Sequence, residues 1–159
     1  MKKKIYVEDE ALKSLLVVAC NISNKECIIS PSIGGVCKKL RTNEKIMGIV
    51  DEDPGFSLPD YFRKMELITD EKEGYGIKVY RDKRNNFLLV ICPRFEEWTL
   101  RCAVDEKINP EKYGLPTDPK KYHGVVNYDL RKTKKLLESL KDSKKMKHFK
   151  EIVSELDKQ

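Results

Sequence analysis

The sequence predicts an α/β fold with a mostly parallel central sheet, helices on both faces and further helices at the C-terminal end. Over residues 3–50, short apolar segments alternate with segments of helical periodicity, which is the signature of parallel strands joined by right-handed crossovers. Two segments, 45–50 and 87–91, are nearly all apolar, as expected for strands that are covered on both faces. Two amphipathic helical segments finish the chain.

The N-terminal elements follow from apolar spacing. In the segment 9–21, apolar residues recur at helical intervals, and in its neighbours they form short extended runs. The expected order is strand 3–7, helix 9–21, strand 26–32, helix 36–43 and strand 45–50. Gly34 and Gly35 are expected to break the chain before the second helix.

The second half predicts a hairpin followed by helices. The expected elements are a loop with a short helix at 54–65, strands 76–82 and 87–93 around a turn at 83–86, helix 94–106, an irregular Pro/Gly-rich connection at 108–127, helix 129–141 and a last helix that begins near Ser143. Trp98 has core spacing in its helix, so we expect it to be a packing residue.

Length and composition indicate one domain, residues 1–159, because 159 residues are enough to bury a core. Charged residues make up 36% of the chain and apolar residues 40%. The basic N-terminus is followed at once by acids rather than by an apolar signal segment, and we therefore expect a cytoplasmic protein. The five cysteines include no C-x-x-C pair, which favours buried reduced thiols.

The positive charge is concentrated near the C-terminus. The net charge is +6, and the segment 129–150 contains nine Lys or Arg residues and only three acids. This segment is a candidate surface for nucleic acid, and a partner protein is a second option. The alternative is a solvated lysine-rich helix face.

Acidic residues follow two of the predicted strands. Glu8 comes directly after strand 3–7, and Asp51 and Asp53 come after strand 45–50. Ligands of open parallel sheets bind outside the carboxyl ends of the strands. If the two strands are neighbours, these three carboxylates converge on one small volume, where like charges require a proton or a cation.

The D-x-D pattern has a geometric meaning. In an extended segment Asp51 and Asp53 point to one side and Glu52 points away, toward solvent or a helix. Carboxylates at an open site suit Mg²⁺ or Mn²⁺. The alternative is that the acids are helix caps or turn residues.

These motifs together resemble the toprim domain of topoisomerases, bacterial-type primases and OLD-type nucleases. The matching pieces are "IYVE" with Glu8, "SIGG" with Gly34 and Gly35, and "IVDED" with Asp51 and Asp53. The resemblance implies Mg²⁺ held by the acids, and a glutamate that acts as general acid/base or as a ligand in phosphoryl transfer on nucleic acids. Asp9 stands where many toprim domains have glycine, and the chain has no counterpart of the nucleophilic tyrosine that topoisomerases take from another domain.

A second segment extends the resemblance. "CPRFEEWTL", residues 92–100, is similar to the P-x-F-E-x-W segment of small uncharacterised toprim-like proteins, some of them linked to phage-defence systems. It implies that Glu96 or Glu97 lies at the same sheet edge. The resemblance covers a core of residues 1–105, and it does not extend to residues 106–159, which comprise the connection and the basic helices.

Three further candidates stay open. Arg94 follows a core strand and could bind phosphate, or it could form a salt bridge to Glu97. Gly34 and Gly35 could hold a phosphate at the following helix N-terminus, or could form only a turn. His123 could reach the acids as a proton shuttle, or could be a solvated loop residue.

The sequence thus favours a Mg²⁺-dependent phosphoesterase or nuclease of toprim-like fold. A non-catalytic module that binds nucleic acid or a protein, in a phage-defence system for example, is the alternative. A small-molecule phosphatase with the same metal site is a third, weaker option.

Overall fold

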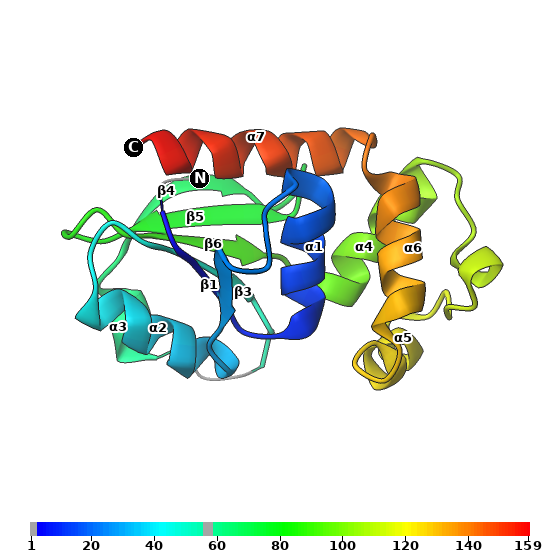
Figure 1. Cartoon of the computed structure of the whole chain (residues 1–159), viewed down its shortest axis with the longest axis horizontal. Helices are drawn as coiled ribbons and strands as arrows, with labels where there is room; N and C mark the ends of the chain where they lie inside the picture. Colours follow the sequence, from blue (N-terminus) through cyan, green and yellow to red (C-terminus); the bar gives the residue numbers. More distant parts are fainter. Residues whose placement is uncertain (1–2, 56–58) are drawn as a thin grey trace.

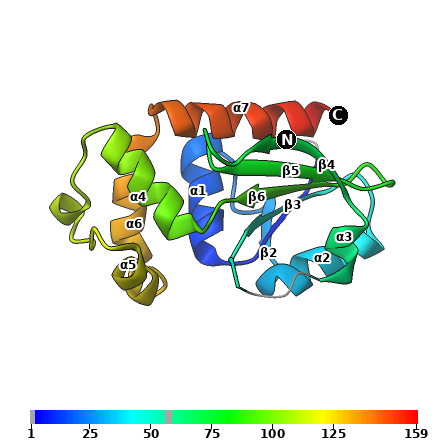
Figure 2. The same cartoon turned by 180° about the vertical axis from the view of Figure 1, so that it is seen from behind.

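The computed structural model describes residues 3–55 and 59–159, and in this part of the chain six strands form one mixed sheet (Figures 1 and 2). The strand order is β2-β1-β3-β6-β5-β4. Strands β2, β1, β3 and β6 are parallel, and β5 and β4 are antiparallel to their neighbours. The strands are β1 (Ile5–Val7), β2 (Cys27–Ile29), β3 (Met47–Asp51), β4 (Glu66–Glu71), β5 (Ile77–Arg81) and β6 (Phe87–Ile91).

Helices cover both faces of this sheet, which confirms the predicted fold class. Helices α2 and α3 lie on one face and α1 and α7 on the other, while α4, α5 and α6 lie together at one end of the molecule (Figure 1). The helices are α1 (Glu10–Cys20), α2 (Ser32–Thr42), α3 (Asp60–Arg63), α4 (Phe95–Asp105), the 3₁₀ helix η1 (Pro110–Tyr113), α5 (Pro119–Val125), α6 (Leu130–Leu140) and α7 (Lys144–Lys158).

Strand alternation divides the buried residues into two clusters. Ile5 and Val7 of β1 belong to the cluster under α1, α4, α6 and α7, whereas Tyr6 between them belongs to the cluster under α2 and α3. All five residues of β6 are buried. The nearly all-apolar strands are therefore covered on both faces, as their composition predicts.

Helix caps define several boundaries that the sequence indicates. Asp9 is the N-cap of α1 and accepts a hydrogen bond from the backbone N–H of Leu12 at 3.0 Å. Ser143 caps α7 in the same way through Met146, which confirms the predicted start of the last helix. Trp98 is 1% exposed and packs against Phe149, so its predicted packing role is confirmed.

Some predicted boundaries were wrong. Helix α2 begins at Ser32 and includes Gly34 and Gly35, so the glycines do not interrupt the chain. The connection at 108–127 contains η1 and α5. Strand β4 was not predicted, because it is an edge strand with a charged sequence, "ELITDE", and mostly exposed side chains. The predicted loop at 54–65 lies partly outside the described residues, and its described part includes α3.

Four of the five cysteines are buried, and Cys20 is only partly buried. All five are free thiols, in agreement with the predicted reduced state. Within the described residues, no helix has both the length and the apolar character needed to cross a membrane.

The C-terminal helices share the main core with the sheet. Thr133, Leu136, Leu137 and Leu140 form the buried face of α6, and this helix packs against α1. Helix α7 contributes Met146, Phe149, Val153 and Leu156 to the same cluster.

Replacing Leu136 by Ala should therefore destabilise the whole chain. The side chain is fully buried, and such a truncation costs about 2–4 kcal/mol. Urea denaturation followed by circular dichroism should show one transition at lower urea concentration, with Lys135→Ala on the exposed face as the control. A separate early transition for the C-terminal helices would contradict this expectation.

Candidate functional site

The acids lie at the point where the strand order changes direction. The chain goes from β1 outward to β2, and then returns to the other side of β1 to form β3. In open parallel sheets this arrangement leaves a crevice at the carboxyl ends of the two central strands, where ligands bind. Glu8 directly follows β1, and Asp51 is the last residue of β3.

Glu8 and Asp51 are in direct contact. One carboxylate oxygen of Glu8, Oε1, accepts a hydrogen bond from the backbone N–H of Asp51 at 2.6 Å. The carboxylate of Asp51 in turn accepts the backbone N–H of Phe95 at 3.0 Å, at the first turn of α4. The predicted convergence of acids from two buried strands is therefore present for Glu8 and Asp51.

The environment disfavours negative charge on both groups. Burial raises the pKa of Glu8 to about 7, against the effect of the hydrogen bond from Asp51, and neighbouring carboxylates add to the rise. Burial and the charge of Glu8 raise the pKa of Asp51 to about 9. Neither carboxylate forms an ion pair within the described ranges. The pair therefore retains a proton near neutral pH unless a cation is bound.

The other acids of the "DED" segment are paired with cations. Asp53 accepts a hydrogen bond from Nε of Arg94 at 2.9 Å, and Glu52 forms ion pairs of 3.0 and 3.1 Å with Lys72 and Lys78. Although burial acts to raise it, these lysine hydrogen bonds hold the pKa of Glu52 below its usual range. Glu52 does face away from the site, but toward lysines rather than toward solvent or a helix.

Arg94 is held between carboxylates. Besides Asp53, it contacts Glu97 at 3.5 Å through Nη1, so the salt bridge considered for it is present. Arg94 and Asp53 are each about one third exposed, at 35% and 33%. Such a partly exposed pair contributes little stability, and a bound phosphate would have to compete with two carboxylates for this guanidinium group.

Glu96 is the buried acid of the neighbouring segment. It is 5% exposed, and its Oε1 lies 3.1 Å from Nδ1 of His123. Its second oxygen, Oε2, is buried and has no hydrogen-bond partner among the described residues. The charge of Glu96 also contributes to the raised pKa values of Glu8 and Asp51, so Glu96 lies close to both acids.

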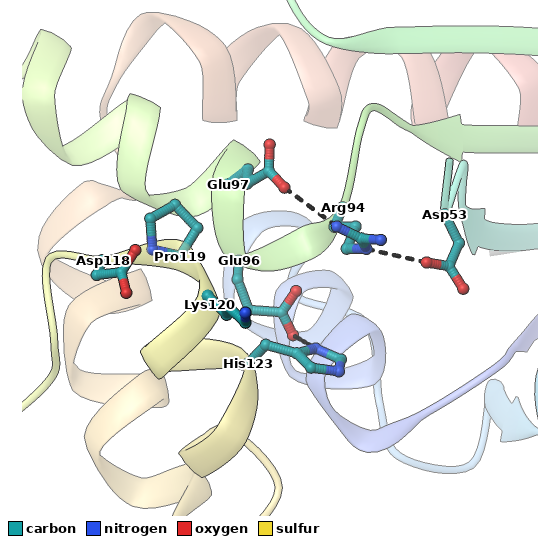
Figure 3. A pocket seen from close by; sticks show the side chains of 8 residues that line it. All are labelled: Asp53, Arg94, Glu96, Glu97, Asp118, Pro119, Lys120 and His123. Atoms are coloured by element: carbon teal, nitrogen blue, oxygen red, sulfur yellow. Dashed lines mark hydrogen bonds and ion pairs between the residues drawn. The ribbon is translucent and has the colours of Figure 1, made fainter. Parts of the chain in front are cut away.

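A cleft of about 500 Å³ opens beside these groups. Figure 3 shows its lining, which comes from Asp53 after β3, from the 94–97 segment and from the 118–123 segment of α5. His123 therefore lies on a helix at the cleft, with a side chain that is 66% exposed. The alternative that His123 is a solvated loop residue is therefore wrong about the loop, because the residue lies in α5. It is right that the side chain contacts solvent.

The side chains are not arranged as a complete metal site. Within residues 3–55 and 59–159, no three His, Cys, Asp or Glu residues are placed so that they could hold an ion together. One oxygen of Glu8 and one of Asp51 accept backbone N–H groups, which leaves each carboxylate a second oxygen. Because Mg²⁺ usually binds through one or two carboxylates and keeps several waters, these two donors fit the ion.

Gly35 has a packing role that the sequence does not reveal. A Cβ atom at Gly35 would lie 3.2 Å from the backbone of Ser30, so the close approach of α2 to the end of β2 favours glycine there. The N–H of Gly35 donates to the hydroxyl of Ser32 at 3.2 Å. Gly34 is exposed in the first turn of the helix.

Comparisons with protein-family models, with curated proteins and with solved structures found no match to this chain.

The raised pKa of Asp51 predicts that Asp51→Asn stabilises the fold at alkaline pH. Between the usual aspartate pKa of 3.8 and about 9, the folded wild type keeps a proton that the unfolded chain has lost, so its stability falls as pH rises through this window. Asparagine does not ionise, so this loss of stability does not occur in the variant. Its side-chain oxygen can still accept the hydrogen bond from the backbone N–H of Phe95. Thermal denaturation should show a gain on the order of 2 kcal/mol at pH 8.5, and a smaller one at pH 5.

Glu52→Gln is the matched control, because it removes an acid that has cationic partners. It should lower or preserve the melting temperature at pH 8.5. A loss of stability in Asp51→Asn at that pH would show that the carboxylate is a structural group.

Proposed function

We propose that this chain is a divalent-metal-dependent phosphoesterase or nuclease of toprim-like fold that acts on nucleic acid. The observation that carries the proposal is the contact between Glu8 and Asp51 at the crevice between β1 and β3. Two partly buried carboxylates without a cationic partner in the described part of the chain are costly for the fold. A functional requirement for a cation explains why they are there.

In this proposal Glu8 and Asp51 hold Mg²⁺ or Mn²⁺. Asp53 would be a third ligand if Arg94 released it, at little cost because that pair is partly exposed. The ion would supply neutralisation of charge on a phosphoryl group and activation of a water molecule. Arg94, which lies beside Asp53, would then be available to a phosphate oxygen.

The charge of the cleft supports a need for metal. Four acids, Asp53, Glu96, Glu97 and Asp118, line it, against the two lysine or arginine side chains Arg94 and Lys120. Glu8 and Asp51 add further negative charge nearby. A phosphate group would be repelled from this volume unless a divalent cation entered with it.

Metal binding and cleavage should depend on Glu8 and Asp51 together. Isothermal titration with Mn²⁺ should show binding to the wild type, and none at similar concentration to Glu8→Gln or Asp51→Asn. Cleavage of labelled DNA and RNA oligonucleotides with Mn²⁺ should fall at least about 100-fold in both variants, because the group that organises the reaction is lost. The Asp51→Ala/Asp53→Ala double variant should also be inactive.

Glu66→Gln provides a control with the same loss of charge on the edge strand β4. It should bind Mn²⁺ and cleave like the wild type. Unchanged metal affinity in the Glu8 and Asp51 variants would contradict the proposal, as would cleavage in the presence of excess chelator.

The basic C-terminal helices favour a second candidate, a module that binds nucleic acid without catalysis. The buried face of α6 contains no basic residue. Four basic residues of this helix are exposed: Arg131, Lys132, Lys134 and Lys135. Arg131 forms an ion pair with Asp129 and Lys132 lies against Gly114, so Lys134 and Lys135 are the residues best placed to contact a polyanion.

If α6 binds nucleic acid, affinity should fall steeply with salt and should not need metal. Lys134→Gln/Lys135→Gln should weaken DNA binding in fluorescence anisotropy and reduce the slope of log affinity against log salt by about 2, one for each lost phosphate contact. Lys38→Gln/Lys64→Gln, on the opposite face of the sheet, is the matched control. Equal slopes for the two double variants would exclude α6 as the binding surface.

A further inference from the structure

The contact between His123 and Glu96 has the geometry of a proton-transfer pair. Nδ1 of His123 lies 3.1 Å from Oε1 of Glu96, and Figure 3 shows the imidazole ring directed toward this carboxylate in the lining of the cleft. A carboxylate on one ring nitrogen orients the imidazole ring and fixes its tautomer. The second nitrogen, Nε2, is then free to carry a proton.

Stability alone does not explain this pair. His123 is 66% exposed, while the side chain of Glu96 is 6% exposed, so a water-exposed histidine compensates a buried acid only weakly. Glu96 lies in the first turn of α4, at the positive end of the helix dipole. Nevertheless, its Oε2 is buried without a hydrogen-bond partner in the described part of the chain, which is costly in a residue that serves only to pack.

The pair also lies beside the proposed reaction centre. The charge of Glu96 acts on Glu8 and on Asp51, and Asp53 and His123 line the same cleft. Lys120, one helical turn before His123, lines it too and has no ion pair among the described residues. A phosphodiester bound at the carboxylates would thus extend toward a histidine and a lysine.

We propose that His123 is the general acid of this site, that Glu96 is its positioning residue, and that the substrate is a phosphodiester with an alkoxide leaving group, as in DNA or RNA. The inference rests on the proposed function and adds the group that the leaving oxygen requires. Water attacks phosphorus, forms the new P–O bond and releases one proton to solvent. The bond from phosphorus to the leaving oxygen breaks, and that oxygen takes the proton from Nε2 of His123, which solvent then protonates again.

Leaving-group chemistry tests this role directly. The alkoxide that leaves a DNA strand needs a proton, whereas nitrophenolate leaves without one. With Mn²⁺, His123→Gln should lose at least about 100-fold in kcat/KM on a labelled DNA oligonucleotide, and less than about 5-fold on bis(p-nitrophenyl) phosphate. Glu96→Gln should show the same selective loss, smaller in size, which a merely structural role would not produce.

Two controls separate chemistry from folding. His148→Gln changes the chain's other histidine, which contacts Glu71 and Tyr75 instead, and it should cleave both substrates like the wild type. In His123→Ala, added imidazole should restore cleavage of the oligonucleotide. Mn²⁺ affinity measured by titration should stay within about 2-fold of the wild type in His123→Gln, since the side chain is not a ligand.

The outcomes distinguish this inference from the proposed function. Equal losses on the two substrates, or no loss on DNA, would overturn the role of His123 and leave the metal-dependent activity standing. A wild-type chain that cleaves neither substrate with Mn²⁺ would overturn both.

Discussion

The site depends on one hydrogen bond, from the backbone N–H of Asp51 to the carboxylate of Glu8. This bond joins the ends of β1 and β3, the two strands between which the sheet changes direction. It places two partly buried acids beside each other at the carboxyl ends of these strands, where each raises the cost of ionising the other. A fold selected only for stability would favour apolar or neutral side chains at such a position, and the proposed cation would offset that cost.

The helices that begin at this edge reduce the cost of the acids. Asp9 caps α1 directly after β1, and Asp51 accepts the first N–H of α4 after β6. Both helix N-termini bring partial positive charge to the carboxylates. The same short connections therefore end the strands, start the helices and hold the acids, which leaves the site on rigid elements rather than on a mobile loop.

Periodicity and composition were sufficient to predict the parallel core and the convergence of Glu8 with Asp51, because buried strands have a strong apolar signal. Strand β4 was missed because an edge strand with one partner needs no apolar run. Helix α5 was missed because prolines and glycines obscure its seven residues. The sequence also could not choose between Glu96 and Glu97 as the buried acid. The position of each residue around the axis of α4 decides which one is buried. Glu96 faces the interior, whereas Glu97 contacts Arg94 at the surface.

The distribution of charge connects the two candidate functions. The exposed basic residues of α6 would attract a polyanion, whereas the acids around Glu8, Asp51 and Glu96 would repel it. A nucleic-acid strand that α6 attracts would therefore be repelled where it meets these acids. It could contact both parts of the molecule only after a cation had bound at the acids. Binding by α6 alone therefore needs no metal, whereas contact of a phosphate with the carboxylates does. Under the proposed function, this separation of charge predicts that cleavage requires metal and that binding of nucleic acid by α6 does not.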